Sequence, residues 1–152
     1  MTRLRETIEI ERPPEQAQAA LEEFFALLCG GDGISRLRLR VPVDGATRKY
    51  GIYLDREVVV EAHRARDEEN LNDVIRIAWL PEGAMVFPRF AGSVAICGQD
   101  DPARSYVELD GSYAPPFGAA GQLFDATIGR QIAQATAREL LKDLKAAIEG
   151  AP

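Results

Sequence analysis

Apolar and polar residues alternate through most of the first 114 residues, the period of strands with one buried face. In 35–43 the apolar positions 37, 39, 41 and 43 alternate with arginines at 36, 38 and 40. The pattern predicts strands at 4–11, 35–43, 47–54, 57–66, 72–80, 87–98 and 104–114. Turn-forming pairs such as Asp44-Gly45 and Asp55-Arg56 separate them. These connections are short enough for antiparallel neighbours.

Two segments have a helical period instead. Pro13-Pro14 permits a helix to begin, and Gly30-Gly31-Asp32-Gly33 ends it near Cys29. A second helix follows Pro115-Pro116-Phe117-Gly118 and runs to about Glu149. The apolar stripe expected in the first helix consists of Leu21, Phe24, Phe25, Leu27 and Leu28. The stripe expected in the second consists of Phe124, Ile128, Ile132, Ala135 or Thr136, Leu140, Leu144 and Ile148, flanked by Leu123 and Leu141.

The order of these elements predicts an α+β fold. A helix of about thirty residues is about 45 Å long, and a broad surface is needed to cover it. We expect a curved antiparallel sheet of about six to seven strands wrapped around the long C-terminal helix, with one or two short helices after the first strand. Residues 1–152 contain no repeat, linker or low-complexity tract, so we expect a single domain.

Composition narrows the possible partners. The net charge is −6 and the pI is about 4.9, so we expect no nucleic-acid partner. No segment approaches the roughly eighteen apolar residues of a membrane span. Cys29 and Cys97 are far apart and have no metal-type spacing, which favours two reduced thiols and a cytoplasmic location.

Two stretches carry a family resemblance. Thr7–Leu21 joins a strand to a helix through Glu11-Arg-Pro-Pro-Glu15, and Tyr106–Glu149 joins Leu109-Asp-Gly-Ser-Tyr113 to the long helix through a Gly-rich entry. Together they resemble the first and last elements of the START-like superfamily, also called SRPBCC, the helix-grip fold of birch-pollen-allergen-type proteins. One departure is Gln16–Ala20, where many members have an aromatic residue in the first helix.

The resemblance implies an apolar cavity between the helix and the sheet that binds lipids, polyketides, quinones or similar molecules. We therefore expect a small hydrophobic ligand in such a cavity. The residues expected to line it are Leu39, Val41, Ile77, Trp79, Phe90, Val94, Leu109, Tyr113, Phe124, Ile128 and Ile132.

Several of these positions have two interpretations. Gly92 and Gly111 lie on the same strand faces and either open space for a ligand or mark bends in a sheet whose core is filled. Trp79 and Tyr113 either reach a ligand or pack in the core.

The alternative is a polyketide cyclase or dehydratase, as some relatives are. His63 is the only histidine, and strand parity places it with Glu61 on a polar face, so we expect it at the surface. Asp110 and Tyr113 fall on opposite faces and do not form a pair. An inward-facing Arg64 or His63 would favour the enzyme. We name no catalytic residue, cofactor or metal site, since His63 has no partner at ligand spacing.

A third possibility is an interaction module with a closed cavity. Arg36, Arg38 and Arg40 form a basic stripe, with Arg64, Arg66 and Arg76 on strands nearby. This face either binds a protein or anion, or is a solvated outer face whose arginines pair with Glu57, Glu61 and Glu108. The acidic total charge favours the solvated face.

Overall fold

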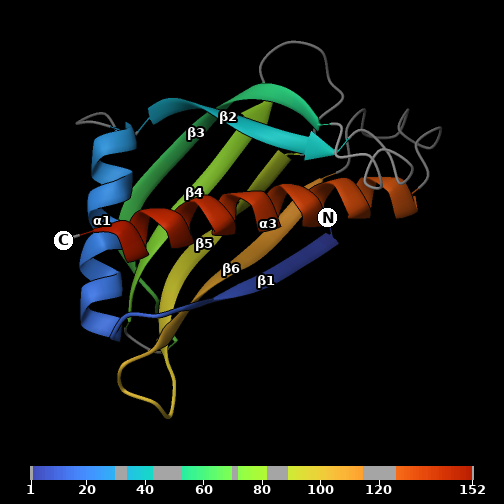
Figure 1. The fold of residues 1–152 in the computed structure, drawn as a ribbon. Coiled ribbons are helices and arrows are strands. Elements are labelled where there is room, and N and C mark those ends of the chain that lie inside the picture. Colours follow the sequence, from blue (N-terminus) through green and yellow to red (C-terminus); the bar gives the residue numbers. More distant parts are fainter. Residues whose placement is uncertain are drawn as a thin grey trace.

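The computed structural model describes residues 2–29, 34–42, 53–69, 72–81, 89–114 and 126–151. These form six strands and two helices (Figure 1). In chain order they are β1 (Thr2–Ile10), α1 (Pro14–Cys29), β2 (Ile34–Pro42), β3 (Tyr53–Arg66), β4 (Asp73–Pro81), β5 (Arg89–Gly98), β6 (Ser105–Ala114) and α3 (Ala126–Gly150).

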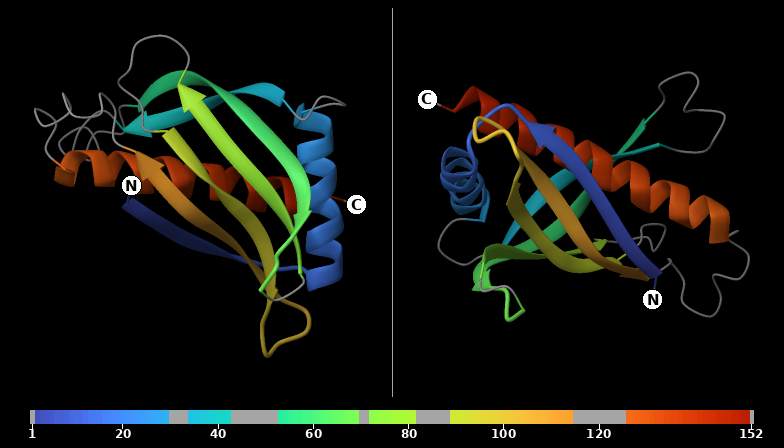
Figure 2. Two further views of the ribbon diagram at one scale, coloured as in Figure 1. Left: turned by 180° about the vertical axis from the view of Figure 1, so that it is seen from behind. Right: turned by 90° about the horizontal axis from the view of Figure 1, so that it is seen from below.

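The six strands form one antiparallel sheet in the order β1-β6-β5-β4-β3-β2. Strands β2 to β6 follow one another in space as in sequence, and β1 returns to pair with β6. The sheet curves around α3, while α1 lies across one end of the concave side (Figure 2). The predicted α+β helix-grip fold is therefore confirmed.

The helix α3 closes the open side of the curved sheet. It packs near β1 and β2, which are the two edge strands, and against α1 at its C-terminal end. Its backbone lies closer to these edges than to the central strands β4 and β5. Side chains therefore have to fill the depth between α3 and the middle of the sheet.

One predicted boundary differs from the structure. The expected turn at Asp55-Arg56 is wrong, because β3 runs unbroken through both residues, which pair with Arg40 and Leu39 of β2. Continuous pairing with a neighbouring strand outweighs the weak local turn preference of two polar residues. The described part of the long helix begins at Ala126, and the predicted strand start at 47–52, the Asp44-Gly45 turn and residues 115–125 lie outside the described residues.

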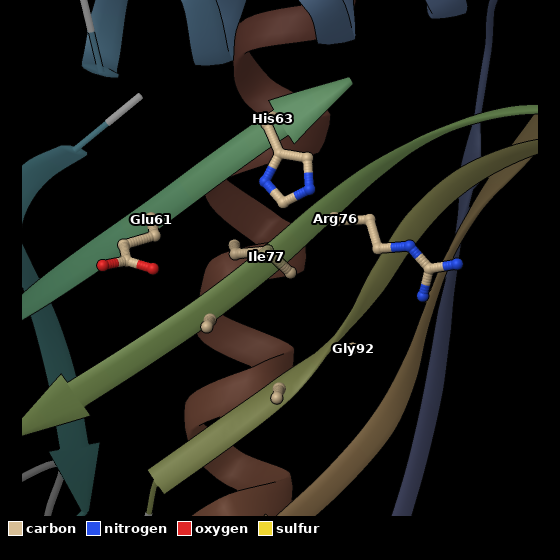
Figure 3. A pocket seen from close by; sticks show the side chains of 7 residues that line it. Glu61, His63, Arg76, Ile77 and Gly92 are labelled. Atoms are coloured by element: carbon tan, nitrogen blue, oxygen red, sulfur yellow. The ribbon is translucent and has the colours of Figure 1, made fainter. Parts of the chain in front are cut away.

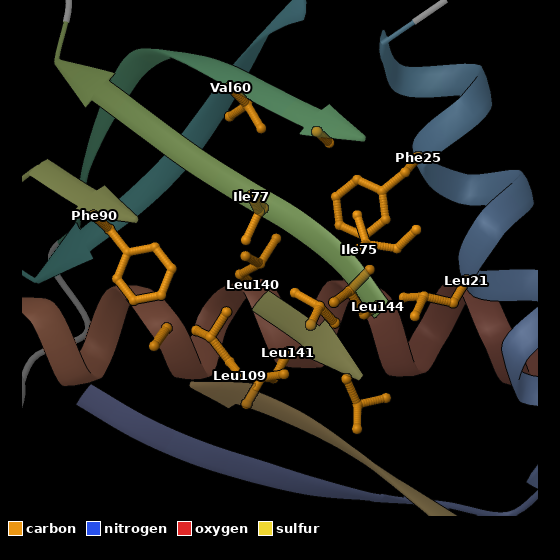
Figure 4. Packing of buried hydrophobic residues seen from close by; sticks show 14 of the residues in the cluster. Leu21, Phe25, Val60, Ile75, Ile77, Phe90, Leu109, Leu140, Leu141 and Leu144 are labelled. Carbon is orange, nitrogen blue, oxygen red and sulfur yellow. The ribbon is translucent and has the colours of Figure 1, made fainter. Parts of the chain in front are cut away.

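The hydrophobic core lies between α3, α1 and the concave face of the sheet (Figure 4). The predicted stripe of α3 is confirmed over its C-terminal half, where Leu140, Leu141, Leu144 and Ile148 are fully buried. In α1, Leu21 and Phe25 are buried as expected, but Leu27 is 78% exposed. Each residue turns a helix by about 100°, so Leu27 points away from the stripe that its neighbour Leu28 joins.

Candidate ligand-binding site

A row of large side chains crosses the concave face. Val60 of β3 pairs with Trp79 of β4, Trp79 with Phe90 of β5, and Phe90 with Tyr113 of β6. All four side chains are buried. The rings of Trp79 and Phe90 are stacked, with centroids 4.2 Å apart and planes 19° from parallel. Three of these four residues are aromatic, so we call the line of Val60, Trp79, Phe90 and Tyr113 the aromatic row.

The next row toward α1 contains the two glycines. Ile77 pairs with Gly92, and Gly92 pairs with Gly111. A Cβ atom on Gly92 would lie 2.3 Å from the backbone oxygen of Asp110 and 2.8 Å from Cζ of Phe90. The ring of Phe90 therefore covers the glycine pair. This favours the interpretation that the glycines allow close strand packing over a filled core.

The part of the concave side next to α1 is also filled. Ile75, Val94 and Leu109 follow one another across β4, β5 and β6 and are buried. Leu140, Leu141 and Leu144 of α3 pack over them, and Leu21 and Phe25 of α1 close the end (Figure 4). Phe90 lies at the opposite end of this cluster from α1. The two ends of the concave side therefore differ: aliphatic packing near α1, and the aromatic row away from it.

The structure brings together six of the eleven residues expected to line a cavity. Ile77, Trp79, Phe90, Val94, Leu109 and Tyr113 are all buried members of one cluster. Leu39 and Val41 lie in β2 opposite Arg56 and Leu54, and Ile128 and Ile132 lie in the first half of α3. The side chains of these four, and the whole of Phe124, lie outside the described residues.

The aromatic row has two polar groups. The indole Nε1 of Trp79 is buried and has no hydrogen-bond partner among the residues that the structure describes. The hydroxyl of Tyr113 likewise bonds to none of the described residues. Every other atom that the four side chains of the row contribute is carbon, so the row is an apolar wall with one N–H and one O–H.

No acidic or basic side chain is buried in the described part of the core, where the buried polar residues are Ser105 and Thr136. Arg64, which would have favoured an enzyme if it faced inward, is exposed, and its Nη2 lies 3.2 Å from Glu22 Oε1 of α1. Glu6 pairs with Arg138 of α3 at 3.2 Å.

The expected facing of the other candidate acid–base groups is confirmed. His63 is exposed. Asp110 accepts hydrogen bonds from Arg3 on the outer face, at 3.1 and 2.8 Å, while Tyr113 is buried on the concave face. The hydrogen bond from Arg3 lowers the pKa of Asp110. Burial raises the pKa of the half-buried Cys97 thiol, which keeps it protonated.

A hollow on the outer face was not expected from the sequence. It has a volume of about 310 Å³ and lies on the side of the sheet away from α3 (Figure 3). Glu61, His63, Arg76, Ile77, Ala78, Ala91 and Gly92 line it. A wider hollow of about 440 Å³ adjoins it and shares Arg76 and Gly92. The signal was present in the small residues Ala78, Ala91 and Ser93, which occupy outward positions on adjacent central strands.

The arginine stripe of β2 stays a prediction. The side chains of Arg36, Arg38 and Arg40 lie outside the described residues, so the partner-binding role of this face is untested. Glu108, expected to pair with these arginines, instead binds Arg5 of the adjacent strand β1 at 2.7 Å. Arg66 lies 4.0 Å from Asp73.

The described residues lack two kinds of feature. They contain no group of three or more histidine, cysteine, aspartate or glutamate residues that could hold a metal ion. Neither described helix has the length and apolar character needed to cross a membrane.

The sheet order, the closing helix and the core between them define a helix-grip fold. Structural comparison supports this assignment over nearly the whole chain. The chain is similar to TTHA0849 from Thermus thermophilus, with a TM-score of 0.55, 20% identity and 97% of both chains covered. It is also similar to the Zhui aromatase/cyclase from Streptomyces sp. R1128, with a TM-score of 0.53, 18% identity and 97% and 91% coverage.

A third solved structure has the same fold. The protein XoxI from Bacillus cereus matches with a TM-score of 0.53 and 13% identity, over 95% of this chain and 96% of that one. No protein-family model and no curated protein sequence matches the chain. At these sequence identities the structural similarity establishes the fold alone. The function has to be argued from the residues of the site.

Proposed function

We propose that the protein binds a small hydrophobic molecule between α3 and the sheet, at the end of the concave side that carries the aromatic row. The observation that carries the proposal is the row itself: Trp79, Phe90 and Tyr113 form an apolar wall with no buried acidic or basic side chain beside it in the described residues. Such walls, with a few polar groups, are typical of small-molecule sites.

The location follows from how the rest of the concave side is used. Leu144 fills the end next to α1, and Leu140 and Leu141 fill the middle of the concave side. We therefore propose that the ligand lies toward the first half of α3, next to the aromatic row. Burying about 200 Å² of apolar ligand surface there would contribute about 5 kcal/mol before ordering costs.

A polyketide cyclase or dehydratase is the second candidate, because one solved structure with this fold is an aromatase/cyclase. Such chemistry needs a group that transfers a proton at the ligand. His63 and Arg64 are both exposed, which speaks against this candidate in the described part of the chain. The hydroxyl of Tyr113 is the group that remains for it.

The test is a titration of the purified protein with the neutral fluorescent probe N-phenyl-1-naphthylamine. Trp79 is the only tryptophan of the chain, so energy transfer from it reports binding close to the aromatic row. We expect one probe molecule per chain and strong transfer. Native mass spectrometry of the same sample should show bound small molecules. A protein that is uniformly ligand-free and binds no probe would contradict the proposal.

A variant pair locates the site. Phe90→Ala removes the central ring of the row and should weaken probe binding at least fivefold. Lys142→Ala changes an exposed residue of α3 and should leave probe binding unchanged. Equal affinities of the two variants would place the bound probe elsewhere.

A further inference from the structure

The hollow on the outer face of the sheet has an apolar floor. Ala78 of β4 and Ala91 of β5 are paired across the strands and line it together with Gly92. Because these side chains are small, the longer side chains around them enclose a depression. Its volume of about 310 Å³ lies at the lower end of the range for small-molecule sites. The hollow therefore fits a compact molecule whose apolar part rests on the two alanine methyl groups.

Three ionisable side chains form the rim of this hollow (Figure 3). His63 of β3 is paired with Arg76 of β4, and Glu61 lies two positions before His63. All three are exposed, and none has a hydrogen bond or ion pair with another residue in the described part of the chain. Arg76 and Glu61 extend away from each other. The rim thus combines the donors of a guanidinium and an imidazole with a separate carboxylate.

The adjoining hollow supplies no partner for Arg76. Arg3 and Asp110 line it together with Arg76, but they bind each other, with Arg3 Nη2 2.8 Å from Asp110 Oδ2. Ser93, which is paired with Arg76 across the strands, adds a hydroxyl beside the guanidinium. Of the two arginines that line the hollows, Arg76 is therefore the one without a carboxylate partner among the described residues.

These charges favour a ligand with a single negative charge. A carboxylate accepts two parallel hydrogen bonds from a guanidinium such as that of Arg76, and an imidazole keeps at least one N–H donor in either protonation state. A second negative charge at the far end of the ligand would lie toward Glu61, which would repel it. The apolar body of the ligand would cover Ala78 and Ala91.

We propose that the outer hollow binds a small monocarboxylate, such as an arylalkanoate, through Arg76 and His63, with its apolar body over Ala78 and Ala91. This site lies on the opposite face of the sheet from the aromatic row. It is therefore additional to the proposed function and does not depend on it.

The test is a titration followed by ¹H–¹³C NMR of protein without an affinity tag. His63 is the only histidine of the chain, so its ring signals report binding at the hollow. We compare 3-phenylpropanoate with the neutral 3-phenyl-1-propanol and with 3-(4-carboxyphenyl)propanoate, which has a second carboxylate. We expect 3-phenylpropanoate to shift these signals saturably, with a dissociation constant of about 1 mM or below. The other two compounds should bind about tenfold more weakly.

A matched pair of variants locates the carboxylate. Arg76→Gln should weaken 3-phenylpropanoate about tenfold, because the paired charged hydrogen bonds are lost. Arg5→Gln removes an arginine from the same outer face that lines neither hollow, and should change the affinity less than twofold. Binding of N-phenyl-1-naphthylamine should be the same in Arg76→Gln as in the wild type.

A third variant tests the preference for a single charge. Glu61→Gln removes the repulsion at the far end of the hollow, so it should strengthen the dicarboxylate about threefold more than the monocarboxylate. An unchanged ratio of the two affinities would contradict this preference.

Three results would overturn the proposed site. The first is the absence of saturable binding of 3-phenylpropanoate to the wild type. The second is an equal loss of affinity in Arg76→Gln and Arg5→Gln, which would indicate attraction by the general charge of this face. The third is a loss in Phe90→Ala but not in Arg76→Gln, which would place the compound on the concave side. The proposed function would stand in each case.

Discussion

At the scale of single residues, Gly92 and Gly111 determine how closely strands β5 and β6 approach each other. A Cβ on either glycine would lie 2.3 Å from a backbone oxygen of the opposite strand and 2.6 Å from the Cα of the other glycine. Backbone atoms cannot move away as a flexible side chain can. The ring of Phe90 lies over the pair, so these two positions also allow the aromatic row to pack.

Gly92→Ala should therefore destabilise the protein strongly. We expect a loss of about 3 kcal/mol or more in the free energy of unfolding, because the added methyl group collides with the backbone of β6. Urea unfolding followed by the fluorescence of Trp79 and by circular dichroism measures the change. The matched control is Gly98→Ala, in the same strand, whose Cβ would meet its nearest neighbour, Cγ of Pro14, at 3.7 Å. Equal stabilities of the two variants would contradict the close approach.

Strand parity was enough to place single side chains on a face. It correctly placed His63 at the surface and separated Asp110 from Tyr113, because successive residues of a strand point to opposite sides. It could not show that Phe90 turns back over the glycines, because that depends on the space left by Gly111 on another strand.

At the scale of helices and strands, hydrogen bonds hold the C-terminal end of α3 to the turn between β1 and α1. Glu149 Oε1 accepts hydrogen bonds from the backbone N–H of Glu11 at 3.0 Å and from Lys145 Nζ at 2.7 Å. Lys145 also donates to the backbone oxygen of Glu9 at 2.7 Å, and Arg12 donates to that of Glu149. The hydrogen bond from Glu11, followed by that from Lys145, lowers the pKa of Glu149 below its ordinary 4.5.

Glu149→Gln should lower stability in a pH-dependent way. A carboxyl group whose pKa is lower in the folded state stabilises the protein above its unfolded pKa, and this contribution is lost as pH falls through the folded value. We expect a difference from wild type of about 1 kcal/mol at pH 7 that shrinks as pH falls below about 4.5. Denaturant unfolding from pH 7 to pH 3 measures it.

The control for this prediction is Glu139→Gln. Glu139 also lies in α3 and pairs with Lys142 at 3.2 Å within the helix, so its loss should cost about 0.3 kcal/mol. A difference that stays constant with pH for Glu149→Gln would show that its carboxylate does not fasten the helix.

At the scale of the whole molecule, the concave side of the sheet has two parts. Next to α1, aliphatic side chains from α3, α1 and the sheet fill the core, while the aromatic row lies away from α1. The backbone of α3 approaches the sheet mainly at the edge strands. Side chains alone therefore determine whether the space between α3 and the central strands is filled. We expect stability and ligand binding to depend on different parts of this surface.

Leu144→Ala tests the division. Leu144 is fully buried in the aliphatic part, so the variant should lose about 3 kcal/mol of stability through the cavity it creates. Its affinity for N-phenyl-1-naphthylamine should change less than twofold under conditions in which the variant is folded. Unfolding curves and probe titrations on the same preparation measure both. A loss of probe affinity as large as that of Phe90→Ala would place the site in the aliphatic part.

The sequence by itself determined the elements and the faces of this protein. Alternation and four-residue spacing are local properties of the chain, so they predicted six described strands, both helices and, apart from Leu27, the buried side of the elements whose side chains the structure describes. The resemblance of Thr7–Leu21 and Tyr106–Glu149 to START-like proteins then supplied the helix-grip arrangement. Where local signals were weak the prediction failed, as at Asp55-Arg56, where pairing with β2 carries the strand onward.

Tertiary structure alone decided which residues meet. Trp79, Phe90 and Tyr113 lie far apart in sequence and form one row because the registers of β4, β5 and β6 align them. The same registers bring Gly92 opposite Gly111 and leave the indole N–H of Trp79 dry and without an acceptor in the described residues. Register and burial are set by contacts between distant segments, and no periodicity within one strand encodes them.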